Sequence, residues 1–131
     1  MSKKNGVRQA YGKKNPNLPF HPAVRAGDFI FVSGQVAKDA EGNMVSGTIE
    51  EETRAAIEAV RRALAEAGAD LDDVVKATVF LEDARNFGRY NGVFKEYFPQ
   101  GLLARTTVEA RAVIETRIEI EVTAYKPLQK E

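Results

Sequence analysis

The stretch FIFVSGQV, Phe29 to Val36, is the part of this sequence that decides the fold. Its β-branched and aromatic side chains predict a strand, and the turn Ala26-Gly27-Asp28 before it predicts a hairpin in which FIFVSGQV is the second strand. Up to Ser33 this strand is apolar on both faces, which is expected where helices cover one face and another layer, such as a second subunit, covers the other. Gly34 interrupts the run and permits a bulge or the close approach of a ligand or chain.

Two amphipathic helices are predicted farther along the chain. Thr48 and Glu51 have the spacing of a capping box, and the helical pattern that they begin ends at Gly68. The apolar run VVKATVFL, residues 74–81, predicts a further strand. A second helix is predicted by residues three or four positions apart, namely Phe87, Tyr90, Asn91, Phe94 and Phe98. We interpret its aromatic stripe as core packing and not as a cofactor-binding surface.

The C-terminal part contains two runs with alternating side chains, residues 106–114 and residues 117–125. They predict an antiparallel hairpin in which Ile114 pairs with Ile118 and Arg111 faces Glu121. Arg105, at the entrance of the first strand, then has no carboxylate opposite it and is available for an external anion. In this register one polar face carries Thr107, Glu109, Arg111, Glu119, Glu121, Thr123 and Tyr125.

The order hairpin, helix, strand, helix, hairpin predicts an α+β domain with two helices on one face of a largely antiparallel sheet. The length of 131 residues fits one domain, and we place a polar, basic N-terminal segment at residues 1–17 and the single domain at residues 18–131. The apolar side chains from Phe29 to Val32 would form an exposed patch on the uncovered sheet face, which predicts burial between subunits.

Composition excludes several classes of function. Lysine plus arginine and aspartate plus glutamate number 19 each, so we expect neither nucleic acid nor an anionic membrane as a partner. The chain has no cysteine and one histidine, His21, which argues against disulfides, a cysteine nucleophile, a histidine-based metal site or a Ser-His-Asp triad. No apolar stretch suits a secretory signal or a membrane span, so a cytoplasmic location is expected.

Arginine and glutamate are the remaining candidates for chemistry. An arginine fork binds a carboxylate through two parallel hydrogen bonds, and a nearby glutamate can orient or deprotonate water. By spacing alone, such residues are better explained as ordinary cross-strand pairs.

Four segments give more specific information, and ARTTVEA resembles the signature P-A-R-[ST]-x-V-E. The segments are VSGQ at 32–35, AGADLDDVVKATVFLED at 67–83, YNGVFKEYFP at 90–99, and ARTTVEA at 104–110 followed by IEIEVTAY at 118–125. Together they resemble the RidA/YjgF family over about Phe20 to Tyr125. The resemblance implies a chorismate-mutase-like fold and a homotrimer with sheets packed around a central barrel and with clefts between subunits. It also implies hydrolysis of 2-aminoacrylate or its 2-imino tautomer to a 2-oxo acid and ammonia, with no cofactor.

Individual roles follow from the resemblance only where residues match. Arg105 matches the arginine that binds the substrate carboxylate, and Glu119 matches the glutamate associated with the attacking water. Ser33, with its neighbour Gly34, and Asn91 match the lining of the cleft. Thr107 stands where relatives often have cysteine. The alternatives are a backbone-bonded strand hydroxyl for Ser33, a loop-anchoring helix residue for Asn91 and a solvated carboxylate for Glu119.

The sequence departs from the family at Phe20-His21-Pro22-Ala23, where many relatives have the tyrosine of Y-S-Q-A. Phe20 lacks that hydroxyl, keeps the wall apolar and could accept a larger substrate side chain, or it could simply pack under the next subunit. His21 could replace the lost donor or base, although a rim position is the more common role for a lone histidine.

Three functions are consistent with these features. The first is a 2-imino acid deaminase, and the second is a non-catalytic trimer that binds 2-oxo acids. The third is a pathway-specific deaminase of a bulkier substrate, such as an aminomuconate-like compound. The endoribonuclease label carried by some relatives ranks below them, because the chain is neutral and has a single histidine.

Overall fold

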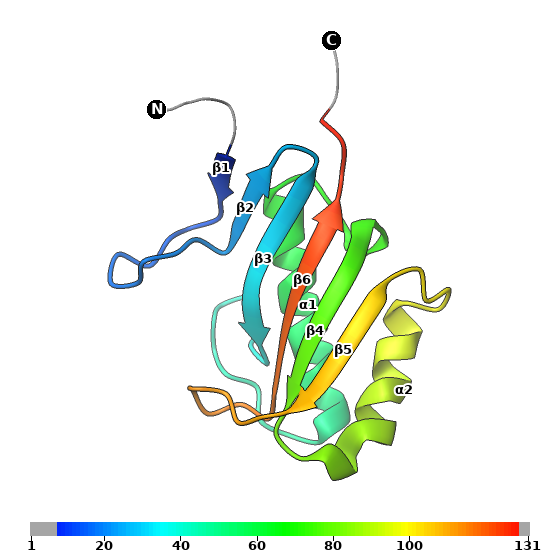
Figure 1. The fold of residues 1–131 in the computed structure, drawn as a ribbon. Helices are drawn as coiled ribbons and strands as arrows, with labels where there is room; N and C mark the ends of the chain where they lie inside the picture. Colours follow the sequence, from blue (N-terminus) through cyan, green and yellow to red (C-terminus); the bar gives the residue numbers. More distant parts are fainter. Residues whose placement is uncertain (1–7, 129–131) are drawn as a thin grey trace.

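The structure, a computed structural model, describes residues 8–128. Six strands form one sheet in the order β1-β2-β3-β6-β4-β5, and the two α-helices pack against it (Figure 1). Short 3-10 turns precede β4 and α2. The elements are β1 (Arg8–Tyr11), β2 (Ala23–Ala26), β3 (Phe29–Val36), α1 (Ile49–Glu66), β4 (Val74–Leu81), α2 (Phe87–Tyr97), β5 (Ala104–Glu109) and β6 (Ile118–Tyr125). The predicted α+β class and largely antiparallel sheet are confirmed.

The hairpin around FIFVSGQV forms as predicted. β2 and β3 are antiparallel and are joined by Gly27-Asp28, where Gly27 has a φ of 61° that favours glycine. The pairing of β3 with β6 shifts register between Val32 and Gln35, so the predicted irregularity at Gly34 is also confirmed. β1 pairs with β2, so the described part of the N-terminal segment extends the sheet.

The capping box that begins α1 is present. Thr48 Oγ1 accepts a hydrogen bond from the Glu51 amide at 3.1 Å, and a Glu51 carboxylate oxygen accepts one from the Thr48 amide at 2.8 Å. The buried face of α1 packs on β3 and β6, and α2 packs beside α1. Within residues 8–128, neither helix is both long enough and apolar enough to cross a membrane.

The predicted C-terminal hairpin is wrong. β5 pairs in parallel with β4, and β6 lies between β3 and β4, antiparallel to both. Ile114 is therefore not paired with Ile118, and Glu121 is paired with Thr78 instead of Arg111. Alternation identifies a strand but not its partner, and the apolar strand β4 separates the two runs. The connection 110–117, orange in Figure 1, crosses the end of β4.

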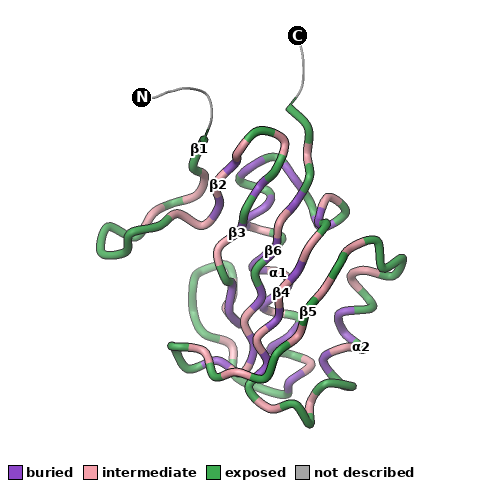
Figure 2. Tube along the Cα trace, viewed as in Figure 1, coloured by how far each residue is buried: buried purple, intermediate pink, exposed green. Residues whose placement is uncertain are grey.

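The two faces of the sheet differ in their cover. Along β6, Ile118, Ile120, Val122 and Ala124 are buried on the side of α1, and the alternate residues project from the opposite face. Figure 2 shows this alternation of buried and exposed positions along the strands. The open face carries exposed large side chains at Phe29, Phe31 and Tyr125.

Candidate functional site

Arg105 lies on the edge strand β5, on the helix side of the sheet. Its partner in the ladder is Ala77, which is fully buried under the helices, so Arg105 points the same way. The guanidinium carbon lies 4.8 Å from the ring centroid of Phe94, 5.1 Å from that of Tyr90 and 5.7 Å from that of Phe87. These distances are in the range of cation–π contacts, which hold the guanidinium against ring faces while its N–H groups stay available. Within residues 8–128, no carboxylate lies within ion-pair distance of Arg105.

The residues beside Arg105 form the first of two groups of candidate site residues. A cavity of about 420 Å³ is lined by Arg105, Asn91 and Phe94 with the segment that follows α2. Thr107, two residues along β5, shares a hydrogen bond of 2.5 Å with the hydroxyl of the buried Tyr90. Burial raises the pKa of Tyr90, so its hydroxyl stays protonated at neutral pH. Thr107 therefore faces the helices and does not share a face with Glu119, contrary to the predicted polar face.

The second group of candidate site residues is centred on Glu119, which lies on β6. A Cβ built at Gly34 would overlap a carboxylate oxygen of Glu119 and lie 2.9 Å from its Cδ, so the carboxylate sits directly over the glycine. Burial raises the pKa of Glu119, and the negative charge of Glu121 raises it further. A partly buried carboxylate with a raised pKa is typical of a group that accepts a proton during a reaction.

A second cavity, of about 480 Å³, opens beside Glu119. Phe20, Ser33 and Gly34 line it together with Glu119, so four of the predicted site residues meet there. The Ser33 hydroxyl donates a hydrogen bond of 2.7 Å to the backbone carbonyl of His21, as the structural alternative for this residue proposed. His21 itself is not among the residues that line either cavity.

The seven predicted site residues thus fall into two groups within one chain. Arg105, Asn91 and Thr107 gather on the helix side at the edge of the sheet. Glu119 projects from the open face, because its neighbours Ile118 and Ile120 are buried against the helices. The register supports this, since Glu119 pairs with Phe80 whereas Arg105 pairs with the fully buried Ala77. One copy of the chain therefore does not present Arg105 and Glu119 to the same ligand.

Sequence reasoning missed the aromatic support of Arg105. Tyr90 and Phe94 are core residues, as predicted, but they also contact the guanidinium. The strand–helix–strand order β4, α2, β5 was the available signal, because such a unit packs its helix against the parallel strands that flank it. Within residues 8–128, no group of three or more His, Cys, Asp or Glu side chains has a metal-binding arrangement.

Comparisons with known proteins connect this geometry to a family. The family model described as Endoribonuclease L-PSP matches residues 12–126. A RutC family protein of Pyrococcus abyssi is 46% identical over 113 residues, which cover 85% of this chain and 89% of that protein. The 2-iminobutanoate/2-iminopropanoate deaminase of Mus musculus is 38% identical over 110 residues, which cover 82% of each chain. The crystal structure of NMB1025, a YjgF family member from Neisseria meningitidis, matches with a TM-score of 0.78 and 32% identity, covering 93% of this chain and 97% of that one.

Proposed function

This chain belongs to the RidA/YjgF family, and we propose that it hydrolyses small 2-imino acids or their enamine tautomers to 2-oxo acids and ammonia. The reaction takes place in clefts between the copies of a homotrimer. Relatives named as 2-iminobutanoate/2-iminopropanoate deaminases support the reaction class.

The observation that carries the proposal is the state of Arg105. Three aromatic rings contact its guanidinium, and within the described chain no carboxylate neutralises it. An arginine fixed in this way loses little conformational freedom when it binds a carboxylate through two parallel hydrogen bonds. Arg105 therefore binds the substrate carboxylate, and Asn91 lines the same cavity.

The placement of Glu119 supports a cleft made by two chains. Glu119 and Arg105 project from opposite faces of one sheet, and β5 is the edge strand of that sheet. An edge strand can approach a neighbouring copy, and the exposed Phe29, Phe31 and Tyr125 give the open face an apolar surface to bury. The Arg105 half of one copy then meets the Glu119 half of the next.

The chemistry needs a positioned water and a base. Water adds to C2 of the protonated imine, the C–O bond forms as Glu119 takes a proton from the water, and the C=N π electrons move to nitrogen. Glu119 returns that proton to nitrogen, which makes the amine a leaving group. The C–N bond then breaks as the carbinol O–H loses its proton to Glu119, which leaves the 2-oxo acid and ammonia.

The proposal is tested by measuring ammonia and 2-oxo acid release from imines that an amino acid oxidase generates in situ. The wild-type chain should accelerate release above the spontaneous rate, and Arg105→Ala should lower kcat/KM by at least about 100-fold, because a desolvated charge interaction is removed. The matched control is Arg111→Ala, which removes an exposed arginine from the loop after β5.

Two other outcomes would replace the proposal. Binding of 2-oxo acids that depends on Arg105, without acceleration of any imine, would make the chain a binding protein. RNA cleavage with a strong salt dependence would instead support the ribonuclease activity named in the family description.

A further inference from the structure

Tyr90 is the one residue that carries a hydroxyl among the three whose rings contact Arg105, and it lies completely inside the protein. It is 0% exposed, whereas Phe87 is 46% exposed. Tyr90 is not among the residues that line the Arg105 cavity. A ligand held in that cavity therefore does not touch Tyr90, and any effect of Tyr90 on the ligand must act through Arg105.

The Tyr90 hydroxyl is bonded to the strand that carries Arg105. It shares a hydrogen bond of 2.5 Å with the Thr107 hydroxyl. Thr107 lies two positions after Arg105 on β5, so the two side chains project from the same face of the strand, roughly 7 Å apart along it. The hydrogen bond therefore fixes the outer end of the Tyr90 ring relative to the short piece of β5 from which the guanidinium projects.

The Tyr90 ring in turn supports the guanidinium. The guanidinium carbon of Arg105 is 5.1 Å from the Tyr90 centroid and 4.8 Å from the Phe94 centroid. Tyr90 and Phe94 meet edge to face with centroids 6.1 Å apart, and Phe94 stacks on Phe98 at 4.6 Å. A guanidinium that packs on ring faces moves with those rings, so the hydrogen bond at the end of the Tyr90 ring also restricts the direction of the Arg105 fork.

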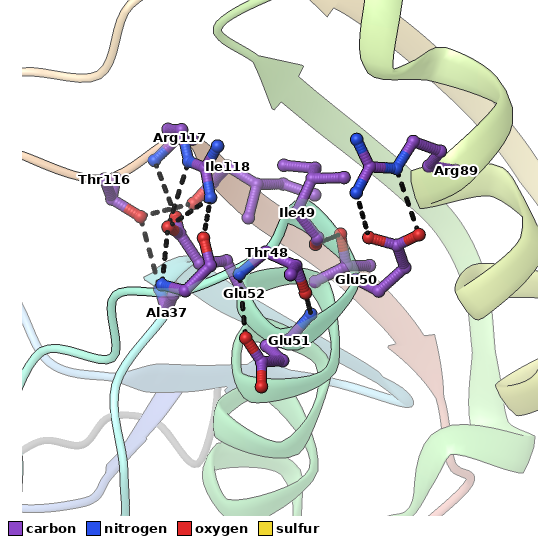
Figure 3. Close-up of polar contacts among 12 residues, drawn as sticks. Ala37, Thr48, Ile49, Glu50, Glu51, Glu52, Arg89, Thr116, Arg117 and Ile118 are labelled. Carbon is purple, nitrogen blue, oxygen red and sulfur yellow. Dashed lines mark hydrogen bonds and ion pairs between the residues drawn. The ribbon is translucent and has the colours of Figure 1, made fainter.

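Other contacts hold the helix that carries Tyr90. Arg89, the residue before it on α2, donates hydrogen bonds of 3.0 Å and 2.9 Å to the two carboxylate oxygens of Glu50 on α1, as Figure 3 shows. Val93 and Phe94 are buried and add apolar packing. Because these contacts do not involve the Tyr90 hydroxyl, its loss should leave α2 in place and affect mainly the ring beside Arg105.

We propose that Tyr90 and Thr107 are positioning residues for Arg105, and that their hydrogen bond sets the direction in which the guanidinium meets the substrate carboxylate. This inference rests on the deaminase function proposed above. Two parallel hydrogen bonds require the fork to lie in the plane of the carboxylate, so a ring that is free to shift weakens them. The carboxylate stays bound throughout the reaction, so the loss should weaken binding of the substrate and of the transition state alike, which raises KM and leaves kcat unchanged.

The test measures kcat and KM for imine hydrolysis together with the dissociation constant of 2-oxobutanoate, a 2-oxo acid of the product class. Tyr90→Phe keeps the ring and removes its hydroxyl, and Thr107→Val keeps the side-chain shape and removes the other partner. Each should raise KM and the dissociation constant by about 5-fold with kcat unchanged, because one hydrogen bond is lost. The double variant should bind no more weakly than Thr107→Val, since both changes remove the same contact. Thr107→Ser keeps the hydroxyl and should bind like wild type.

Tyr97→Phe is the matched control on the same helix. The Tyr97 hydroxyl donates a hydrogen bond of 2.9 Å to Glu58 on α1, but its ring contacts Arg54 and Arg61 instead of Arg105. The change in melting temperature of this variant measures the cost of losing a tyrosine hydrogen bond from α2. Its KM and its dissociation constant should equal those of wild type.

The outcomes separate this inference from the underlying function. Unchanged KM and dissociation constants in Tyr90→Phe and Thr107→Val would overturn the positioning role, whatever their melting temperatures. The same increases in Tyr97→Phe, or a fall in kcat at constant KM, would also overturn it. If wild type hydrolyses no imine, the deaminase function fails, and the 2-oxobutanoate dissociation constants still decide the positioning role. Absence of 2-oxobutanoate binding as well would overturn both.

Discussion

Arg105 and Glu119 project from opposite faces of the same sheet, although β5 and β6 are separated by a single strand. Arg105 lies against the aromatic face of α2, and Glu119 lies over Gly34 on the open face. A site that uses both residues on one small substrate therefore takes each from a different copy of the chain.

This relationship predicts complementation between inactive variants. Arg105→Ala and Glu119→Gln should each be nearly inactive as pure proteins. Mixed assemblies, formed by refolding the two together, should regain roughly a quarter of the wild-type clefts, because an intact Arg105 can meet an intact Glu119 on a neighbour. Imine hydrolysis by the mixture measures the recovery. The double variant mixed with either single variant is the control, and recovery no greater than in that control would place both residues in one chain's site.

The pH profile should show the raised pKa of Glu119. The pKa is raised by burial first and by Glu121 second, and the base is the deprotonated form. The logarithm of kcat/KM should therefore rise with pH through a value above the ordinary 4.5 of a glutamate. Glu121→Gln should move this rise to lower pH, because it removes the negative neighbour. A profile that Glu121→Gln leaves in place would show that another group controls the rise.

The same shift has a consequence for stability. Because the folded pKa of Glu119 is raised, this group favours the folded state below the ordinary value of 4.5, and the contribution is lost as the pH rises through the folded pKa. In that window the free energy of unfolding of wild type should fall with pH more than that of Glu119→Gln. Denaturant unfolding at a series of pH values measures the difference, and parallel curves for the two proteins would contradict the shift.

Gly34→Ala tests the position of the Glu119 carboxylate. A Cβ at residue 34 would overlap that carboxylate, and the flexible side chain can move away without unfolding the sheet. We expect kcat to fall by about 100-fold, as for a catalytic group displaced by about 1 Å, with little change in melting temperature. Gly88→Ala is the matched control, because a Cβ there has no neighbour within 4 Å. Equal activity of the two variants would show that Glu119 takes no part in the reaction.

Glu52→Ala tests the contact that anchors the connection to β6. The Glu52 side chain is 5% exposed and lies 2.9 Å from Arg117 Nη2, and its loss leaves that arginine without its carboxylate. We expect a loss of about 2 kcal/mol in the free energy of unfolding. The control Glu96→Ala breaks an exposed pair with Arg54 and should cost much less, because solvent screens that pair. Equal losses in urea unfolding would show that the buried pair contributes no more to the free energy of unfolding than the exposed pair does.

Local sequence signals predicted most of the elements. The turn at Gly27-Asp28, the capping box at Thr48 and the irregularity at Gly34 each depend on residues close together in the chain, and the structure contains all three. The prediction that failed was the partner of a strand. Both 106–114 and 117–125 alternate, but pairing depends on which strand occupies the space between them, and neither run contains that information.

The candidate site shows the same contrast between what local sequence predicts and what long-range pairing decides. The sequence by itself determined which residues are candidates for chemistry, because arginine is the side chain that binds a carboxylate through a planar fork and the motif ARTTVEA singles out Arg105. Only the tertiary structure decided how they are grouped. The parallel pairing of β5 with β4 turns Arg105 toward α2, and the insertion of β6 turns Glu119 to the other face. Side chains alternate along every strand, so the face on which a residue acts is fixed by long-range register, which no local pattern specifies.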